Sequence, residues 1–555
     1  MKILKLELSG MSCEGCAKVV RDILEHPAIQ EKDITYAASG GQIRFDDSEI
    51  EEEEVLALIR KTPYRIEHYT VESGVKTEDT VYDLLILGGG SAAFSAAIRA
   101  NTLQKRTLII QGGLPLGGTC VNVGCVPSKF LLRAAEQVHL AGQSRFAGIQ
   151  LQGKPKVDFN LLVKEKRELV AQLRKQKYSD ILEGLEYVRM VEGMGYLTGE
   201  RTIRVGEVEY KGEQILIATG SRTKIPNVEG LSKSGYLTAT TLFDLEELPE
   251  SIAVLGGGYI ALELAQMMSR LGASVSILQR SNRILSKEHP DVSEEIQRQL
   301  EEEGITFQLG VVLKRVSRTK NRVLIEFDQG DNSKSIEATH IVVATGTVPN
   351  THQIGLEDIG VKMTSNGHIQ TDAYLRSSID GIWACGDVIE TPAYVYVAAY
   401  EGALAVDNMY GDEGGEVCCS AALKKADYRA MPWVVFTDPQ VAGVGMDELQ
   451  AEAVGMEYEV SVLPMTYVPR CIVSKDTRGW IKLLRNKQTK EIIGARIVAP
   501  EGSELTMEIS LAIRHRVKSE EIAEAFHAYL TMSEAVKLAA IGFGKSVEQL
   551  SCCAS

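Results

Sequence analysis

One arrangement occurs twice in this chain and constrains its fold more than any other feature. An apolar segment, a glycine-rich turn and an apolar-faced helix follow one another from Val81 (VYDLLILGGGSAAFSAAIRA) and again from Ser251 (SIAVLGGGYIALELAQMMSR). A second repeated pair, ILIATGS at 215–221 and IVVATGT at 341–347, follows in the same order. The repetition predicts two Rossmann-like α/β domains, each of which binds a dinucleotide.

The first glycine-rich turn has the spacing Gly88-x-Gly90-x-x-Ala93. Its first glycine permits a tight turn, and its second lets the backbone approach a pyrophosphate that rests on the helix N-terminus. An acidic residue is expected at the end of the next strand to bind the ribose, but Gln111 stands there, a neutral group that can still bond a hydroxyl. The alternative is a tight turn without a ligand, and the second copy of the pattern counts against it.

The second turn has the spacing Gly256-x-Gly258-x-x-Ala261. No carboxylate follows its next strand, and Arg280 and Arg283 lie in this region instead. Arginine accommodates a 2′-phosphate through charge-assisted bonds, so the pattern predicts NADPH rather than NADH. The alternative is that both arginines are solvated surface charges.

The composition is that of an ordinary folded protein. Hydrophobic residues make up 44% and charged residues 24% of the 555 positions, which excludes disorder and collagen-like structure. A formal charge of −15 disfavours nucleic acid and anionic membranes as partners, because both repel an acidic chain. No apolar run reaches the roughly 18 residues of a membrane span, and the N-terminus lacks the apolar core of a signal peptide. We therefore expect a cytoplasmic protein.

Most of the ten cysteines occur in close pairs. The pairs are Cys13/Cys16, Cys120/Cys125, Cys418/Cys419 and Cys552/Cys553, while Cys385 and Cys471 stand alone. In a reducing compartment such pairs indicate metal binding or redox work rather than structural bridges. The two single cysteines are expected to be buried, Cys471 within a strand-like segment.

Residues 1–70 alternate strand-like and helix-like segments in the order βαββαβ, typical of a small ferredoxin-like module, and the polar segment 71–80 is expected to be a linker. Cys13 and Cys16 lie in GMSCEGC, just before the first helix, and this loop resembles that of heavy-metal-associated domains. Two thiolates at a helix N-terminus suit a soft cation, whereas Zn(II) would need four ligands. A thioredoxin-like use of the pair is the alternative, but no thioredoxin-type βαβ unit follows.

The segment GGTCVNVGCVPSK carries Cys120 and Cys125 and resembles the redox-active disulfide of the flavin-dependent pyridine nucleotide–disulfide oxidoreductases. The resemblance implies that Cys125 contacts the flavin ring and that Cys120 is the interchange thiol. Helix N-termini and cationic groups stabilise the thiolate that such chemistry needs. Two buried small hydrophobic residues are the alternative, which the glycine-rich surroundings and Lys129 disfavour.

Other motifs extend this resemblance over most of the chain. It implies that Lys129 lies near flavin N5 and pairs with Glu263, that Tyr259 gates the nicotinamide pocket, and that ACGD carries the second flavin motif. The residues expected to bind FAD are Gly88, Gly90, Ala93, Gln111, Gly118, Thr119, Lys129, Thr219, Gly220, Gly386 and Asp387. Those expected to bind NADPH are Gly256, Gly258, Tyr259, Arg280, Arg283 and Gly346.

The expected fold class is α/β, with two Rossmann-like domains, an α+β dimerisation domain and the small N-terminal module. The FAD-binding domain is expected to comprise residues 81–230 and 351–425, and the NADPH-binding domain residues 231–350. The dimerisation domain, with a Cys-Cys tail, is expected to comprise residues 426–555.

The C-terminal region distinguishes between branches of the family. Disulfide reductases carry a His-x-x-x-x-Glu dyad whose histidine is a general acid–base. Counting back from Glu534, that position holds Tyr529, and His527 is out of register. A phenol titrates near pH 10, so disulfide reduction is disfavoured. YLTMSEAVKLAA, VPRCIVSKDTRGWIKLL, VVFTDPQVAGVG and QLSCCAS instead resemble the mercuric reductases.

That resemblance implies that Cys552 and Cys553 take Hg(II), from thiol complexes or from the N-terminal module, and hand it to Cys120 and Cys125 of the partner subunit in a homodimer. Soft thiolates suit this ion. Tyr178 and Tyr529, the latter across the dimer, are expected to assist the transfer. The alternatives are incidental exposed thiols and ordinary surface tyrosines.

The expected activity is NADPH-dependent reduction of Hg(II) to Hg(0) through FAD and the inner cysteine pair. Two other functions stay open: reduction of a low-molecular-weight disulfide, and stoichiometric metal buffering by the thiols. No role is assigned to Cys418 and Cys419.

Overall fold

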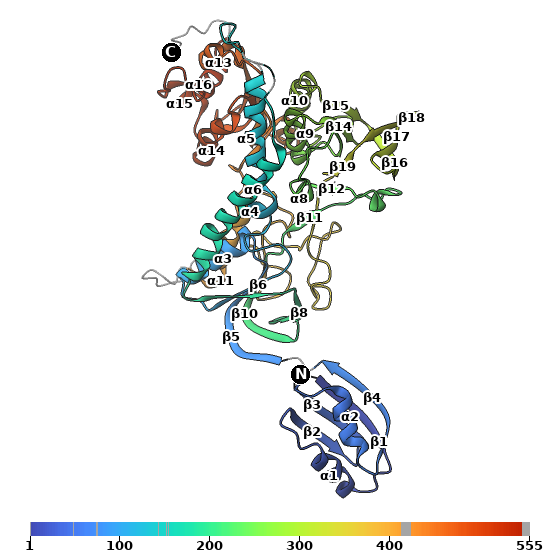
Figure 1. The fold of residues 1–555 in the computed structure, drawn as a ribbon. Coiled ribbons are helices and arrows are strands. Elements are labelled where there is room, and N and C mark those ends of the chain that lie inside the picture. The colour runs from blue at the N-terminus through green and yellow to red at the C-terminus, as the bar shows by residue number, and fades with distance from the viewer. Residues whose placement is uncertain are drawn as a thin grey trace.

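The computed structural model describes residues 2–47, 49–73, 76–142, 144–150, 153, 155–411 and 423–546. The predicted roles of Cys418, Cys419, Cys552 and Cys553 therefore concern residues outside the described part. Figure 1 shows the N-terminal module at one end of the molecule, two α/β units, and a C-terminal unit at the other end. Among the described residues, no helix is long and apolar enough to cross a membrane.

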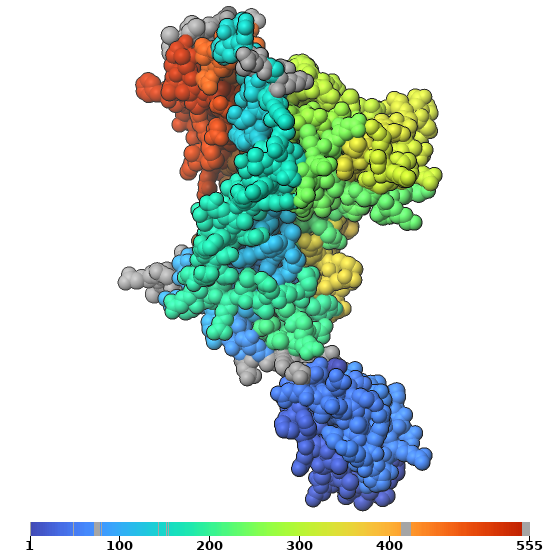
Figure 2. Space-filling view, viewed as in Figure 1, coloured from blue at the N-terminus to red at the C-terminus, as the bar shows by residue number. Residues whose placement is uncertain are grey.

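The N-terminal module has the predicted βαββαβ order. Its elements are β1 (Lys2–Ser9), α1 (Glu14–Ile23), β2 (Ile29–Thr35), β3 (Gly40–Phe45), α2 (Glu52–Arg60) and β4 (Arg65–Ser73). The strands form one sheet in the order β2-β3-β1-β4, and both helices bury apolar residues against it. Figure 2 shows this module in blue as a separate lobe.

The segment 71–80 is mostly strand rather than an irregular linker. Strand β4 ends at Ser73, and β5 (Lys76–Leu87) begins three residues later. Its first two residues already pair with Val208 and Glu209 of β10 (Val208–Ile217), and a bulge separates them from the rest of the ladder. The polar composition of the segment concealed this pairing, because the start of β5 pairs with β10 before the apolar residues Leu84–Leu87, which lie between β6 and β10.

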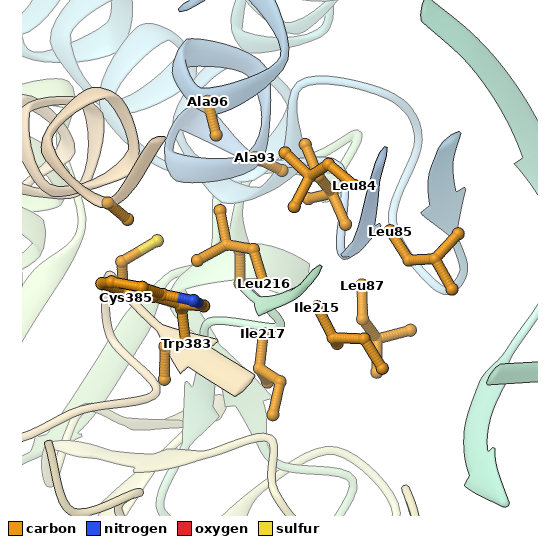
Figure 3. Packing of buried hydrophobic residues seen from close by; sticks show 14 of the residues in the cluster. Leu84, Leu85, Leu87, Ala93, Ala96, Ile215, Leu216, Ile217, Trp383 and Cys385 are labelled. Carbon is orange, nitrogen blue, oxygen red and sulfur yellow. The ribbon is translucent and has the colours of Figure 1, made fainter. Parts of the chain in front are cut away.

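The first α/β unit is built on a seven-stranded sheet. Its order is β7-β6-β5-β10-β9-β8, and β21 pairs with β10. The further strands are β6 (Thr107–Gln111), β7 (Val188–Glu192), β8 (Gly195–Gly199), β9 (Thr202–Val205) and β21 (Ile382–Ala384). The helices are α3 (Ser91–Thr102), α4 (Gly118–Val123), α5 (Cys125–Gly142), α6 (Phe159–Arg174), η1 (Lys175–Ser179), α7 (Asp180–Glu183) and α11 (Val395–Tyr410). Figure 3 shows side chains of β5, α3, β10 and β21 packed together in its core.

The second α/β unit repeats this plan with a five-stranded parallel sheet in the order β12-β19-β13-β14-β15. The strands are β12 (Leu237–Thr238), β13 (Ser251–Leu255), β14 (Ser274–Gln279), β15 (Thr306–Leu309) and β19 (His340–Val343). The helices are η2 (Leu231–Lys233), α8 (Ala239–Leu242), α9 (Tyr259–Leu271) and α10 (Pro290–Glu302). A three-stranded antiparallel sheet adds β16 (Val311–Arg318), β17 (Val323–Gln329) and β18 (Asn332–Ala338). Two short strands, β11 (Ser221–Thr223) and β20 (Thr347–Pro349), pair between the units.

The C-terminal unit is a five-stranded antiparallel sheet in the order β22-β23-β26-β25-β24. Its strands are β22 (Pro432–Val435), β23 (Gln440–Gly445), β24 (Tyr458–Pro464), β25 (Trp480–Asn486) and β26 (Ile492–Ala499). The helices are α12 (Glu448–Ala453), η3 (Met465–Tyr467), α13 (Pro469–Ser474), η4 (Gly502–Leu505), α14 (Thr506–His515), α15 (Ser519–Glu524) and α16 (Glu534–Ile541). Cys471 is buried as expected, but it lies in helix α13 and not in a strand, because Pro469 starts a helix at its first position. The expected α/β class with an α+β C-terminal unit is confirmed.

Candidate functional site

The two glycine-rich turns have the same local construction. A Cβ atom on Gly88 would lie 2.2 Å from the carbonyl oxygen of Ala218, and one on Gly256 would lie 2.3 Å from that of Ala344. Ala218 and Ala344 begin the two ATG segments, so each segment closes directly on the first glycine of its turn. No residue with a side chain fits these two positions.

Both turns leave a helix N-terminus open to a ligand. Gly90 and Gly258 are the N-cap residues of α3 and α9, and neither helix has a side chain that caps its first turn. The first N–H groups of each helix therefore remain available to an anion. A Cβ on Gly118, the first residue of α4, would lie 2.7 Å from the Cα of Gly90, so the start of α4 passes close to the first turn. Ala93 does not face this opening, because it is fully buried in the core below α3.

Glutamines occupy the same position in both units. A Cβ on Gly89 would lie 1.8 Å from Gln111 Oε1, and one on Gly257 would lie 3.1 Å from Gln279 Cγ. Gln111 also donates from its amide nitrogen to the carbonyl oxygen of Leu114, which turns its side chain into the loop.

The arginines predicted to bind a 2′-phosphate follow strand β14. Arg280 is exposed, and Arg283 donates to the carbonyl oxygen of Ser286 at 3.0 Å. Gly346 is exposed, with φ +101°, and its carbonyl oxygen accepts from the backbone of Lys224.

Hydrogen bonds join the 215–221 segment to the second predicted flavin segment and to the chain after the second ATG segment. Asp387 accepts a hydrogen bond from Ser221 at 2.8 Å. Thr219 donates to the carbonyl oxygen of Asn350 at 2.8 Å, next to Gly220 with φ +67°. Sequence reasoning missed both residues, although Ser221 ends the first repeated ATG segment and Asn350 lies three residues after the second.

A buried carboxylate that the sequence did not indicate supports this segment. Glu401, in α11, is fully buried and accepts from the backbone N–H of Gly386 at 2.6 Å and from the hydroxyl of Tyr428 at 2.7 Å. Burial raises the pKa of the Glu401 carboxyl above its usual value. Glu401 thereby holds the turn that presents Asp387.

Cys120 and Cys125 lie on successive helices, and both are free, half-buried thiols. The hydrogen bond that Cys120 donates, together with the charge of Lys129, lowers the pKa of Cys125 to about 7 despite its burial. That same hydrogen bond and burial raise the pKa of Cys120. Cys125 is also the first residue of α5, where the helix dipole stabilises an anion. The pair therefore presents one thiolate and one thiol near neutral pH.

Lys129 and Glu263 form the predicted ion pair, with Nζ and Oε2 2.7 Å apart. Lys129 lies one turn after Cys125 on α5, and Glu263 lies on α9, which packs against α5. The other oxygen of Glu263 accepts from the backbone N–H of Phe436 at 2.9 Å, and Lys129 Nζ lies 4.7 Å from the centre of the Phe436 ring. The pair thus joins both α/β units to the C-terminal unit.

Tyr178 lies close to Cys120 and Cys125, on the π-helical turn η1. Its ring centre is 4.9 Å from that of Phe94, and a Cβ on Gly117 would lie 3.0 Å from Tyr178 Cε2. Burial raises the pKa of Tyr178, and the nearby charges of Cys120 and Cys125 contribute. π-Helical turns often occur at functional sites.

The N-terminal module presents a second cysteine pair at the start of α1. Cys13 is its exposed N-cap residue, and the sulfur atoms of Cys13 and Cys16 lie 3.6 Å apart. Hydrogen bonds from the Ser12 backbone and the Tyr64 hydroxyl lower the pKa of Cys16 to about 6. The sequence placed Tyr64 nearly 50 positions away and did not signal this contact.

Comparison with known proteins agrees with this geometry. The family model described as pyridine nucleotide-disulphide oxidoreductase matches residues 82–402, more than half of the chain. The chain belongs to this family. The family's dimerisation-domain model matches residues 431–540, and a heavy-metal-associated domain model matches residues 5–65.

Several relatives match along their whole length. The chain is 37% identical over 552 residues to a mercuric reductase of Staphylococcus aureus, covering 99% of both proteins. It is 37% identical to one of Lysinibacillus sphaericus, covering 100% of both, and 40% identical to one of Streptomyces lividans, covering 86% of this chain and 99% of the relative.

A solved structure also superposes well. It is the Cu(II) complex of the HOCl-induced flavoprotein disulfide reductase RclA of Escherichia coli, with a TM-score of 0.74 and 26% identity. The match covers 83% of this chain and 99% of that chain. Membership of the family implies that the chain uses a flavin and a pyridine nucleotide.

The C-terminal unit lacks the family's histidine at the position five residues before Glu534. Tyr529 stands there and is 55% exposed in the single chain. His527 pairs with Glu508, its Nε2 2.8 Å from the carboxylate, and so is engaged elsewhere.

Proposed function

We propose that the chain catalyses the reaction NADPH + Hg(II) → NADP⁺ + H⁺ + Hg(0), with FAD as its prosthetic group. The observation that carries the proposal is the Cys120/Cys125 pair, with one stabilised thiolate beside Lys129, in a chain that displays a second dithiol in a heavy-metal-associated module. Similarity to mercuric reductases over the whole chain supports the choice of ion.

The residues present fit both nucleotides. The uncapped N-terminus of α3 and the close approach of Gly90 and Gly118 suit the FAD pyrophosphate, and the uncapped N-terminus of α9 suits that of NADPH. When bound, the flavin supplies a two-electron path from the nicotinamide to the cysteine pair. We assign FAD to residues 81–230 and 351–425, NADPH to residues 231–350, and subunit contact to residues 426–555.

The inner cysteines do the work of holding the ion. Cys120 and Cys125 bind Hg(II) between them, and Cys120 releases its proton as it binds, because soft thiolates are the preferred ligands of a soft cation. The ammonium group of Lys129 stabilises the Cys125 thiolate, and the ion pair with Glu263 keeps the Lys129 side chain in place. Two electrons convert the ion to a neutral atom, for which thiolates have little affinity, so the product leaves.

Delivery of the ion uses thiol-for-thiol exchange. Cys13 is exposed and Cys16 partly exposed, so the pair suits uptake from Hg(II)–thiol complexes. Cys552 and Cys553 pass the ion to Cys120 and Cys125 of the partner subunit. Tyr529 reaches that pair across the homodimer, and Tyr178 lies beside it within the chain. We assign the reaction to the cytoplasm, where NADPH is available and thiols stay reduced.

A second candidate is reduction of a low-molecular-weight disulfide, as the name of the superposed reductase suggests. The residue at the general-acid position is Tyr529, and a phenol transfers protons poorly at neutral pH. A third is metal buffering without turnover. This would show stoichiometric Hg(II) uptake and no catalytic oxidation of NADPH.

One assay distinguishes the three candidate functions. NADPH oxidation is followed with Hg(II)–thiol complexes while elemental mercury vapour is trapped, and again with glutathione disulfide or lipoamide. We expect vapour in proportion to NADPH consumed and little turnover with the disulfides. The variant Cys552→Ala/Cys553→Ala should lose most of its Hg(II)-dependent NADPH oxidation at millimolar thiol. Full activity would exclude delivery of the ion by Cys552 and Cys553.

The coenzyme assignment has its own test. Arg280→Glu should reverse or abolish the preference for NADPH over NADH, because it places a carboxylate where a 2′-phosphate is proposed to bind. Arg298→Glu, on the exposed side of α10, is the matched control and should leave the preference unchanged. An Arg280→Glu variant with the original preference would contradict the assignment.

A further inference from the structure

Three sulfur atoms from separate segments meet inside the C-terminal unit. The thiol sulfur of Cys471 lies 3.6 Å from the thioether sulfur of Met532 and 3.9 Å from that of Met465. Met465 begins η3, Cys471 lies in α13, and Met532 precedes α16. Met465, Cys471 and Met532 are 0%, 1% and 9% exposed. The tertiary structure thus gathers one thiol and two thioethers in the core.

The spacing of these sulfur atoms suits a bound cation. Metal–sulfur bonds are about 2.3 Å long, and three of them in one plane place neighbouring sulfurs about 4 Å apart. Both measured distances are close to this value, so small movements of the flexible methionine side chains admit an ion between the three atoms. Thiolates and thioethers are ligands that select soft cations such as Cu(I).

The charge of the cluster favours a monovalent ion. Burial raises the pKa of the Cys471 thiol to about 11, so the thiol is protonated and uncharged at neutral pH. Cu(I) in place of that proton keeps the cluster uncharged, whereas a dication would leave a positive charge in the core, which is costly. The nearby carboxylate of Asp476 does not offset such a charge, because it is already paired with Arg478 and Arg145.

A cavity connects the cluster with the surface of the single chain. Cys471 and Met532 line a cavity of about 210 Å³ that lies between α5, α9 and the C-terminal unit. The exposed side chains of Arg133 and Leu140 line it as well. A small cation can therefore approach two of the three sulfur atoms without crossing the packed core.

We propose that Cys471, Met465 and Met532 form a binding site for a soft monovalent cation, Cu(I). On binding, a Cu–S bond forms to Cys471, its S–H bond breaks, and the proton passes to solvent. The two thioethers each donate a lone pair, and no atom changes its oxidation state. This inference does not depend on the proposed reduction of Hg(II), because it uses none of the residues assigned to that reaction.

Copper titration of the full-length holoenzyme tests the site. The reduced protein is first treated with N-ethylmaleimide in its native state, which alkylates the accessible thiols. Cys471 stays unmodified, because it is buried and protonated. Cu(I) is then supplied anaerobically as its bicinchoninate complex, and transfer to the protein is followed by the loss of the colour of that complex. We expect one Cu(I) per chain to transfer, and no transfer would overturn the inference.

Three variants test whether the cluster holds the transferred ion. Cys471→Val removes the thiol and should abolish the transfer. Met532→Leu keeps the thiol and the approximate side-chain volume, and should weaken Cu(I) binding at least about 10-fold because one ligand is lost. Met268→Leu, at a buried methionine in the core of the second α/β unit, is the matched control and should bind like the native protein. Native affinity in Cys471→Val or Met532→Leu would overturn the inference and leave the three sulfurs a role in packing alone.

X-ray absorption at the copper edge provides a second measurement, made on the alkylated native chain loaded with one Cu(I). Three sulfur ligands at about 2.3 Å are expected. Two sulfur ligands, or nitrogen or oxygen ligands, would overturn the inference. This measurement and Met532→Leu both stay informative if Cys471→Val fails to fold, because an exchange of methionine for leucine is well tolerated in a core.

Discussion

Cys13 and Cys16 lie at a helix N-terminus with Cys13 exposed and Cys16 partly exposed, whereas Cys120 and Cys125 are both half-buried beside an ion pair that joins three parts of the chain. In both pairs one thiol has a lowered pKa, Cys16 to about 6 and Cys125 to about 7. Only the causes differ. Neutral donors from Ser12 and Tyr64 act on Cys16, while a neighbouring thiol and the charge of Lys129 act on Cys125.

The difference separates two uses of one functional group. An accessible pair stabilised by neutral hydrogen bonds exchanges a soft ion readily with thiols in solution. A half-buried pair that depends on a fixed cation keeps its charge only in the assembled site, where electrons arrive. The four predictions below test this division.

The largest expected effect is loss of the inner thiolate. Cys125→Ser should lower Hg(II)-dependent NADPH oxidation by at least about 100-fold, because the group that binds the reacting ion is gone. Cys16→Ser should retain most of the activity when Hg(II)–thiol complexes are in excess. The measurement is initial rate with trapped mercury vapour. Similar losses in both variants would remove the proposed division of labour.

The two pairs should also separate by pH. A thiolate is the deprotonated form, so its fraction falls as pH drops through its pKa, and the lower pKa keeps its thiolate to lower pH. At pH 6, alkylation of Cys16 should proceed at about half its maximal rate and that of Cys125 at about one-tenth. Peptide-level mass spectrometry of the reduced, metal-free protein measures both rates in one sample. Coincident profiles would contradict the different stabilisation.

Lys129→Met should raise the pH midpoint of Cys125 alkylation by about one pH unit, because the nearest positive charge is removed. Glu263→Gln is the matched control: its carboxylate raises the pKa of Cys125, so its removal should shift the midpoint slightly downward. Cys16 serves as the internal reference in each sample. An unchanged Cys125 midpoint in Lys129→Met would show that the ion pair does not support the thiolate.

The smallest expected effect concerns the Cys13/Cys16 pair. Tyr64→Phe removes one of several hydrogen bonds to Cys16 and should raise its alkylation midpoint by about half a pH unit, with Cys125 unaffected. Tyr36→Phe, at an exposed tyrosine of the same module, is the control and should change nothing. If both variants behave alike, Tyr64 has no part in stabilising this thiolate.

Local sequence patterns predicted most of the fold. The paired glycine turns, the two ATG segments and the βαββαβ order depend on backbone geometry and residue spacing, and each of them appears where it was predicted. Cys471 was placed in the wrong element, since an apolar segment of that length suits a strand or a short helix equally. The strand over residues 76–80 was missed because its partner, β10, lies more than 120 positions later.

The sequence by itself determined which chemical groups the chain has: two thiol pairs within the described residues, a lysine one turn after the second pair, and two glycine turns able to approach a phosphate. Only the tertiary structure decided how those groups are tuned. Tyr64 reaches Cys16, Glu401 supports Gly386, and the C-terminal sheet holds Tyr259 through Glu288 and Arg496. Such contacts join residues far apart in the chain, and no local spacing rule encodes them, because they depend on how whole sheets and helices pack.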